Sequence, residues 1–193
     1  MTDSGDQVDK PMHPTAASSQ PFQVANLRPT EKLFDDAEGR DRLEKAMSRY
    51  PDRRAALLPM LGYAQERNGW VSDESMEEVA NALNLTPAYV RSVATFYTMY
   101  NKHPVGRHLI QVCTCISCHV NRGEDVFEAF LEHTGTRAGE VSEDGKWTVI
   151  EAECLGACGF ATAVQVNDQY FENVTPETVP EVLAQLEKGG SEE

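Results

Sequence analysis

The sequence predicts an α+β protein in which an N-terminal helical bundle is followed by a small β-sheet flanked by helices. Two observations predict this fold class. Apolar residues recur with a helical period up to about residue 101, and short β-rich runs begin only beyond His103-Pro104. The 193 residues are enough for one ordinary domain with a helical appendage. The predicted segments are a disordered tail at 1–32, a helical bundle at 33–104, the sheet domain at 105–188 and a short tail at 189–193.

The N-terminal tail is predicted from its composition, because it is rich in Ser, Thr, Pro, Gln and Asp and has few large apolar side chains. Its first residues, Met1-Thr-Asp-Ser-Gly-Asp, are acidic and have neither the basic region nor the apolar region of a signal peptide. No apolar run approaches the ~20 residues that a membrane span requires. We therefore expect a cytoplasmic protein without direct membrane insertion, in which five cysteines are metal ligands or reactive thiols rather than disulfides.

The formal net charge of −14 argues against a nucleic-acid partner, because phosphates require clustered Lys and Arg. The 17 Lys and Arg residues are scattered along the chain. An acidic balance of this size favours solubility, and the alternative is an acidic docking face for another protein.

Three amphipathic helices are predicted within the bundle. Ser72 is a good N-cap residue with two acidic residues after it, and Thr86-Pro87 places Pro at a first helical position. The earliest helix contains Pro59, so it must be kinked or begin later than Asp52. The apolar stripes are Leu57, Leu58, Leu61 and Ala64, ended by Asn68-Gly69; Met76, Val79, Ala80 and Leu83; and Val90, Val93, Ala94 and Tyr97.

The sheet domain is predicted to run β-α-β-β-α, which gives a small sheet covered by two helices. Its first strand is His108–Cys113, and its first helix ends near Gly135. A polar loop spans 139–145, and Asn167-Asp168 forms a hairpin turn. The other strands are 147–150 and 162–166, and the last helix begins at Thr175-Pro176. The apolar face of the first helix is Val126, Phe127, Phe130 and Leu131, and that of the last helix is Val179, Val182, Leu183 and Leu186.

Four of the five cysteines form two pairs, Cys113-x4-Cys118 after one predicted strand and Cys154-x3-Cys158 after another. Both pairs should therefore lie at one end of one sheet. A binuclear iron cluster needs two ligands for each iron, and thiolate is the ligand that iron–sulfur clusters prefer. The spacing favours a 2Fe-2S cluster on these four residues.

Two other uses of the thiols stay open on spacing alone. A zinc-stapled interaction module could use the same four cysteines, although the x4 and x3 spacings are unusual for zinc. A thiol oxidoreductase could use Cys115-x2-Cys118, which leaves Cys154 and Cys158 unexplained. No catalytic residue is expected, because the sequence offers no nucleophile with a base and no glycine-rich nucleotide loop. His119 is expected to be a surface residue and not a ligand of a Rieske centre.

Four motifs resemble the thioredoxin-like 2Fe-2S ferredoxin subunit of NADH:quinone oxidoreductase, the respiratory complex I: Tyr50–Leu61, Val93–Tyr100, Pro104–His108 and Cys154–Gly159. The resemblance implies a thioredoxin-like ferredoxin behind a helical bundle. It also implies that Cys113, Cys118, Cys154 and Cys158 hold the 2Fe-2S cluster, and that a partner protein of the complex brings FMN and the NADH site. The complex would hold this electron carrier at the cytoplasmic face of the membrane. The same module in an NAD-linked hydrogenase or formate dehydrogenase is the alternative.

The chain departs from the pattern of that family at two positions. Cys115 stands where the family usually has a non-cysteine residue, and we expect it to be a bystander that points away from the cluster. Thr162 stands where the family usually has Pro after Ala161. This replacement bears on how rigidly the chain leaves Cys158.

Overall fold

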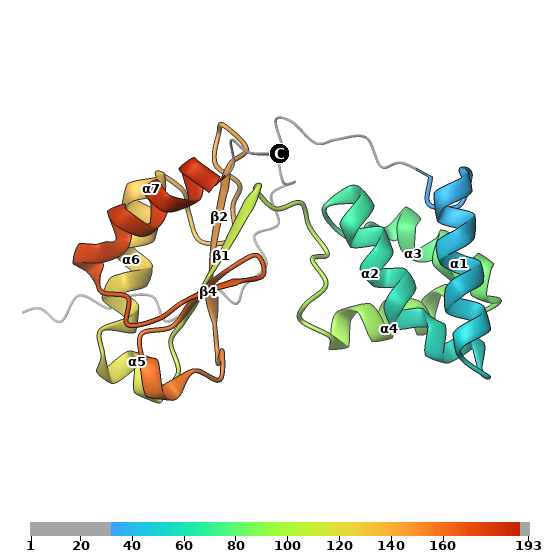
Figure 1. Ribbon diagram of the computed structural model, residues 1–193, viewed down its shortest axis with the longest axis horizontal. Helices are drawn as coiled ribbons and strands as arrows, with labels where there is room; N and C mark the ends of the chain where they lie inside the picture. The colour runs from blue at the N-terminus through green and yellow to red at the C-terminus, as the bar shows by residue number, and fades with distance from the viewer. Residues whose placement is uncertain (1–31, 190–193) are drawn as a thin grey trace, which may run out of the picture.

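The structure is a computed structural model that describes residues 32–189, arranged in two lobes (Figure 1). Helices α1–α4 form one lobe, and a four-stranded sheet with helices α5–α7 forms the other. Each lobe has its own core of buried apolar side chains. The predicted tails lie outside the described residues except for Lys32 and Gly189.

The helical lobe contains α1 (Ala37–Arg49), η1 (Arg53–Ala56), α2 (Leu57–Asn68), α3 (Asp73–Leu83) and α4 (Pro87–Phe96). The expected late start of the Pro59 helix is confirmed, since α2 begins at Leu57 and Pro59 falls in its first turn. A proline is tolerated there because the first-turn N–H groups have no partner within the helix. Gly69, at φ 78°, ends α2 in the left-handed conformation.

The predicted caps of this lobe are confirmed. The Ser72 hydroxyl accepts a hydrogen bond from the Ser75 N–H at 3.1 Å, and the Thr86 hydroxyl accepts one from the Tyr89 N–H at 3.3 Å. Tyr97 was predicted inside the last stripe, but α4 ends at Phe96 and the Tyr97 side chain is exposed. Leu58 is also exposed. The buried core is Leu33, Ala46, Ala56, Leu57, Met60, Leu61, Tyr63, Ala64, Val71, Met76, Val79, Ala80, Leu83, Val90, Ala94 and Tyr100.

The second lobe is built on a mixed sheet with the strand order β2-β1-β3-β4. Strands β1 (His108–Cys113) and β2 (Trp147–Ala152) are parallel, and β3 (Val164–Val166) is antiparallel to β1. The predicted hairpin is confirmed, since β3 and β4 (Gln169–Phe171) pair around Asn167 and Asp168. Strand β3 is two residues shorter than predicted at its start.

Helices α6 (Gly123–Thr134) and α7 (Val179–Gly189) lie together on one face of this sheet (Figure 1). The predicted order β-α-β-β-α is found with β4 as a fourth strand, and with additions at α5 (Ile116–Val120), η2 (Cys158–Phe160) and η3 (Pro176–Thr178). The α+β fold class is likewise confirmed. The core between the sheet and these helices is Ile110, Val112, Val126, Phe130, Trp147, Val149, Val164, Val166, Val174, Val179, Val182 and Leu186.

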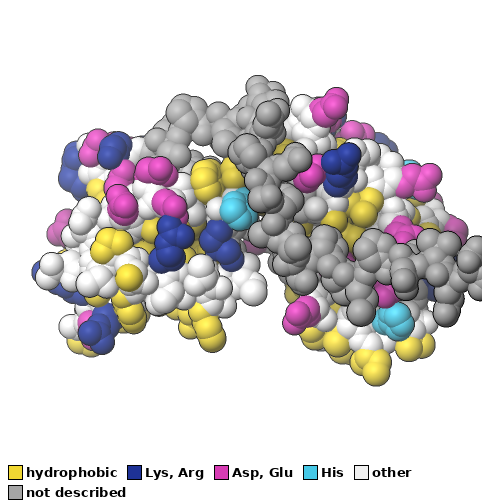
Figure 2. All heavy atoms as spheres, turned by 180° about the vertical axis from the view of Figure 1, so that it is seen from behind, with side chains coloured by type: hydrophobic (Ala, Val, Ile, Leu, Met, Phe, Trp, Pro, Cys, Tyr) yellow, Lys and Arg dark blue, Asp and Glu magenta, His cyan; other side chains and the backbone are white. Residues whose placement is uncertain are grey.

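Within residues 32–189, every helix is too short or too polar to cross a bilayer. The face shown in Figure 2 carries acidic side chains on both lobes, interspersed with Lys and Arg. On this face the described acidic residues are therefore dispersed, which favours the solubility interpretation over a single acidic docking patch.

Candidate metal centre

The topology of the sheet brings the two cysteine pairs to one edge. Strands β1 and β2 are parallel, and Cys113, the last residue of β1, lies opposite Ala152, the last residue of β2. Cys154 follows β2 by two residues, so both cysteine loops leave the sheet at its carboxyl edge. These two loops are far apart in the sequence and meet here because the crossover through α6 returns the chain parallel to β1.

Cys113 and Cys118 form an inner pair that is almost fully buried, at 3% and 2% exposure. Burial raises the pKa of Cys118 to about 11, the neighbouring Cys113 and Cys158 thiols act in the same direction, and a hydrogen bond from the Ala163 N–H opposes them.

Cys154 and Cys158 form an outer pair that is exposed to solvent. Gly156, at φ +76°, turns the loop between them, and Cys158 begins the short helix η2. Within the described part of the chain, no three His, Cys, Asp or Glu side chains are grouped closely enough to hold one metal ion. Cys113 and Cys118 are thus buried on the inner side of this edge, and Cys154 and Cys158 are exposed in the loop that follows β2.

Ala163 contacts the inner pair through its backbone. Its carbonyl accepts a hydrogen bond from the Cys113 N–H at 3.0 Å. The preceding residue, Thr162, is buried, and its hydroxyl donates to the Asn121 carbonyl at 2.9 Å and lies 3.4 Å from the Cys118 carbonyl oxygen. This segment therefore supports the inner cysteine pair from the direction of β3.

Gly123, at the start of α6, supports the inner pair from the other direction. A Cβ atom on this glycine would lie 2.9 Å from the carbonyl oxygens of both Cys113 and Cys118. Only a residue without a side chain fits this approach. Sequence reasoning did not find the roles of Gly123 and Ala163, because no local pattern marks a backbone contact that arises from packing.

Cys115 lies at the N-cap of α5 and is partly buried against a small cluster formed by Cys113, Cys118 and Ala163. Cys113 and Cys158, rather than Cys115, are the thiols that shift the pKa of Cys118. The bystander role of Cys115 stays a prediction. His119 is exposed, and its Nδ1 lies 3.3 Å from the Glu124 carboxylate, as expected for a surface histidine.

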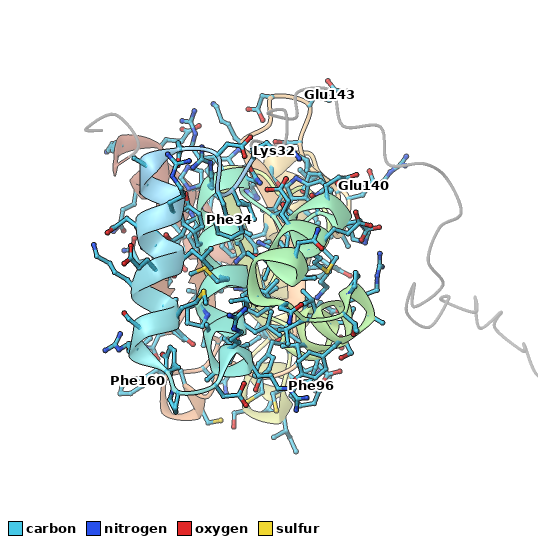
Figure 3. All side chains as sticks on the ribbon, turned by 90° about the vertical axis from the view of Figure 1, so that its right-hand side faces the viewer. Lys32, Phe34, Phe96, Glu140, Glu143 and Phe160 are labelled. Carbon is cyan, nitrogen blue, oxygen red and sulfur yellow. The ribbon has the colours of Figure 1, made fainter. Side chains whose placement is uncertain are left out.

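Large apolar side chains are exposed around the cysteine loops. Ile116 and Val120 of α5 are 77% and 75% exposed, and Phe160, two residues after Cys158, is 53% exposed. Figure 3 shows Phe160 at the same end of the molecule as Phe96, which is exposed at the end of α4. Apolar surface of this kind, beside a candidate metal centre, is typical of a contact surface for another molecule.

A mixed sheet of this order, with two helices on one face and cysteine loops at the carboxyl edge of its parallel strands, defines a thioredoxin-like domain with a thiol-lined site. The chain belongs to the Thioredoxin-like [2Fe-2S] ferredoxin family, whose pattern matches residues 43–187. This match confirms the family-level prediction and supports an iron–sulfur cluster over a zinc site.

Two relatives cover most of this chain, and both are NADH-quinone oxidoreductase subunits. The relative from Rickettsia bellii is 42% identical over 146 residues, which are 74% of this chain and 87% of the relative. The relative from Thermus thermophilus is 40% identical over 160 residues, which are 81% of this chain and 87% of the relative. The predicted resemblance to a component of NADH:quinone oxidoreductase is confirmed.

A solved structure shares the fold at much lower identity. An air-oxidized NAD+-reducing [NiFe]-hydrogenase matches with a TM-score of 0.60 at 17% identity, over 69% of this chain and 23% of that chain. At this identity the likeness establishes the fold and no function.

Proposed function

We propose that this chain is an electron-transfer subunit of NADH:quinone oxidoreductase. In this proposal Cys113, Cys118, Cys154 and Cys158 hold one 2Fe-2S cluster, which exchanges single electrons with FMN on a partner subunit that oxidises NADH. The observation that supports the proposal is the placement of both cysteine loops at the carboxyl edge of the parallel strands β1 and β2, in a chain of the 2Fe-2S ferredoxin family.

The residues at this edge fit a binuclear cluster. Such a cluster supplies one-electron redox chemistry and needs two thiolates on each iron. All five cysteines are free, and each of the two loops offers one pair. The inner pair lies where water is excluded. Burial is one of the means by which a protein adjusts a cluster's potential.

The surface around the cysteines supports a partner at this end of the lobe. The outer pair is exposed, and so are the apolar side chains of Ile116, Val120 and Phe160. A protein partner that covers these groups would bring its own redox centre close to the cluster. In the proposal this partner is the flavin- and NADH-binding subunit, and the complex holds the chain at the cytoplasmic face of the membrane.

A hydrogenase or a formate dehydrogenase remains the alternative assembly for the same module. The likeness to the NAD+-reducing hydrogenase rests on fold alone, whereas the subunits of NADH-quinone oxidoreductases reach 40–42% identity over about three quarters of the chain or more. The identity therefore favours NADH:quinone oxidoreductase.

The test is metal and sulfide analysis of the anaerobically purified full chain, followed by EPR spectroscopy of the reduced protein. We expect two irons, two acid-labile sulfides and a spin-half signal for each chain. Stoichiometric zinc without iron would overturn the proposal. The chain alone should not reduce ferricyanide with NADH, because the FMN and the NADH site belong to the partner.

The ligand assignment is tested by single Cys→Ser variants at 113, 118, 154 and 158. Each variant should weaken or abolish the EPR signal, since serine is a poorer ligand for iron than thiolate. An unchanged signal in any one variant would remove that residue from the ligand set. The matched control is Cys115→Ser, which changes a neighbouring cysteine in the same loop.

A further inference from the structure

A groove with an apolar floor and a basic rim lies between α1 and α2 of the helical lobe, and its volume is about 250 Å³. Figure 1 shows α1 on the side of this lobe that is farther from the sheet lobe. The groove is therefore separate from the cysteine edge, and the proposed electron transfer makes no use of it.

The floor of the groove is formed by side chains of the helical core. Met60 and Tyr63 of α2 are almost fully buried, and Tyr50 and Pro59 extend the apolar lining. The Arg42 guanidinium lies 5.6 Å from the centre of the Tyr63 ring, so floor and rim are in contact. A volume of about 250 Å³ is below the roughly 300–1,000 Å³ of sites that enclose a small molecule. The groove therefore fits an apolar side chain of a larger partner better than a whole small ligand.

The rim of the groove carries three cations on one face of α1. Arg42, Lys45 and Arg49 are separated by three and four residues, and together they span about 10 Å along the helix. Among the described residues that line the groove, only Glu66 is acidic. In a chain with a formal net charge of −14, the rim is thus a local excess of positive charge.

The three cations are available to a partner. The Arg42 Nη2 atom lies 3.8 Å from the Glu38 carboxylate and 3.7 Å from the Glu66 carboxylate, and the Lys45 Nζ lies 2.6 Å from the Asp41 carboxylate. These side chains are about half exposed or more, and exposed ion pairs contribute little to stability. Carboxylates of a partner can therefore replace them at low cost. Arg49 forms no ion pair with the residues that the structure describes.

We propose that this groove is a docking site for an acidic amphipathic helix of a partner protein. A helix that lies alongside α1 and α2 presents its side chains at the same spacing of three and four residues. Its carboxylates pair with Arg42, Lys45 and Arg49, and an apolar side chain between them enters the groove. The complementary charge selects an acidic partner and rejects a basic one. The proposal does not depend on the cluster, because the groove lies in the other lobe.

The probe is a fluorescently labelled synthetic helical peptide with glutamates at positions i, i+3 and i+7 and a leucine at i+4. Fluorescence anisotropy measures its binding to the full chain. We expect saturable binding that weakens as salt is added, because the paired charges are exposed. A peptide with glutamines in place of the glutamates, and one with alanine in place of the leucine, should each bind more weakly. Absence of saturable binding would overturn the proposal.

The test variant replaces the three cations of the rim together, as Arg42→Gln, Lys45→Gln and Arg49→Gln. Three exposed ion pairs are lost, so binding of the probe peptide should weaken by about tenfold. Circular dichroism checks that the variant is folded. Arg49→Gln alone serves if the triple variant does not fold, and it should weaken binding by about two- to fivefold. Unchanged binding in the folded variant would overturn the proposal.

The matched control removes the same number of positive charges from exposed or half-exposed side chains of the sheet lobe, as Arg107→Gln, Arg137→Gln and Lys146→Gln. Like Arg42, Lys146 is paired with two acidic side chains, since its Nζ lies 3.6 Å from both the Asp144 and the Glu187 carboxylates. The control variant should bind the probe peptide as tightly as the unsubstituted chain does. An equal loss of binding in the two triple variants would mean that only the net charge of the chain matters, and it would overturn the groove as the site.

A carbodiimide, which joins an amine to a carboxylate in contact with it, identifies the occupant of the groove. In the chain alone Lys45 should couple to Asp41, whose carboxylate is 2.6 Å away. With the probe peptide present, Lys45 should couple to a peptide glutamate. Coupling to Asp41 alone under these conditions would overturn the proposal. So would coupling of Lys45 to residues 1–31 or 190–193, or to a second copy in a mixture of isotope-labelled and unlabelled chains, because each result assigns the groove to another occupant.

Discussion

The helix starts of the helical lobe and the cysteine edge of the sheet lobe differ in how far along the chain their polar contacts reach. In the helical lobe the helix starts are satisfied by side chains three residues away, as in the bonds from the Ser75 N–H to Ser72 and from the Tyr89 N–H to Thr86. At the cysteine edge of the sheet lobe, the Thr162 hydroxyl bonds a carbonyl 41 residues away. Local sequence therefore marks these helix starts, whereas the candidate metal centre depends on the topology of the sheet. The packing of the helices against one another also uses distant contacts, such as the hydrogen bond from the Tyr100 hydroxyl to the Leu58 carbonyl, 42 residues away.

The lobes also differ in what is buried. The helical core contains large apolar side chains throughout, among them Leu57, Leu61 and Leu83. The buried apolar cluster at the cysteine edge consists of Cys113, Cys118 and Ala163. Three small side chains bury little apolar area, so hydrogen bonds and bound metal must supply the order at this edge. Substitutions in the helical core should consequently change stability, and substitutions at the cysteine edge should change the cluster.

The largest expected effect on stability is that of Leu61→Ala in α2. Leu61 is fully buried in the helical core, so its truncation should lower the free energy of unfolding by about 2–5 kcal/mol. Chemical denaturation followed by circular dichroism measures the loss. The EPR signal should be unchanged under conditions in which the variant is folded, and a changed signal would contradict the separation of the two lobes.

Leu58→Ala is the control for this variant. Leu58 lies in the same helix and has the same side chain, but it is 37% exposed. Its truncation leaves no sealed cavity, so the loss should be clearly smaller than that of Leu61→Ala. Equal losses at the two positions would show that burial in the helical core is not the source of the effect.

A smaller effect on stability, with a consequence for iron, is expected for Gly123→Ala. The new Cβ would meet the carbonyl oxygens of Cys113 and Cys118 at 2.9 Å, so backbone must shift, at a cost of about 1–3 kcal/mol. The shift moves the inner pair, and we expect faster loss of iron to a chelator. The rate is measured from the decay of visible absorbance.

Gly62→Ala in α2 makes the same substitution in the other lobe. A Cβ on Gly62 meets no atom within 4 Å, so the variant should be stabilised by about 0.4–1 kcal/mol through the lower entropy of its unfolded chain. Iron release should be unchanged. If both glycine variants release iron at the same rate, the close approach of Gly123 is unimportant for the cysteine loop.

The helical lobe and the strands could be predicted from sequence because their signals are local. Apolar periodicity placed α3, and Ser72 and Thr86 marked two helix starts. The end of α4 was misplaced because Tyr97 is followed by no glycine or proline close enough to stop the pattern, and the chain leaves the helix there to begin the connection to β1. Periodicity predicts the interior of an element better than its ends.

The cysteine edge was predictable in part. The spacing of Cys113, Cys118, Cys154 and Cys158 and the neighbouring strands indicated that both pairs meet. The helix α5 was not predicted, since five residues are too few for a periodic pattern. Strand β3 begins late because Thr162 turns into the interior toward α5 instead of pairing in the sheet. The ligand roles of the four cysteines stay predictions.

A weaker and pH-dependent effect is expected at an exposed contact of the sheet lobe. The Thr175 hydroxyl, the Glu177 backbone N–H and the Arg122 guanidinium, in that order, lower the pKa of Glu177 to about 2. Arg122 lies just before α6, and its Nη1 donates a hydrogen bond to the Oε1 atom of Glu177 in η3 at 2.9 Å. Because the pKa is lower in the folded chain, the contact stabilises the fold above the ordinary carboxyl pKa of about 4.3, and this stabilisation is lost as pH falls toward 2.

Glu177→Gln tests this dependence. The difference in unfolding free energy between the unsubstituted chain and E177Q should be largest near pH 6 and should shrink progressively between about pH 5 and pH 2. Added salt should reduce the difference at pH 6, since an exposed pair is screened. A difference that is constant across this pH range would mean that the charge of Glu177 contributes nothing to the fold.

The smallest effect is expected for Cys115→Ser. Cys115 is the N-cap of α5, and its side chain makes no capping hydrogen bond. Serine is among the preferred N-cap residues, and its hydroxyl could accept the N–H of Ser117 or Cys118. The variant should therefore be as stable as the unsubstituted chain, or more stable by up to about 1 kcal/mol. If Cys115 is a bystander, iron content, EPR spectrum and potential should match those of the unsubstituted chain. Loss of the cluster in this variant would make Cys115 a ligand and would remove Cys113 or Cys118 from the set, because a loop of this length presents three thiols where a cluster needs two.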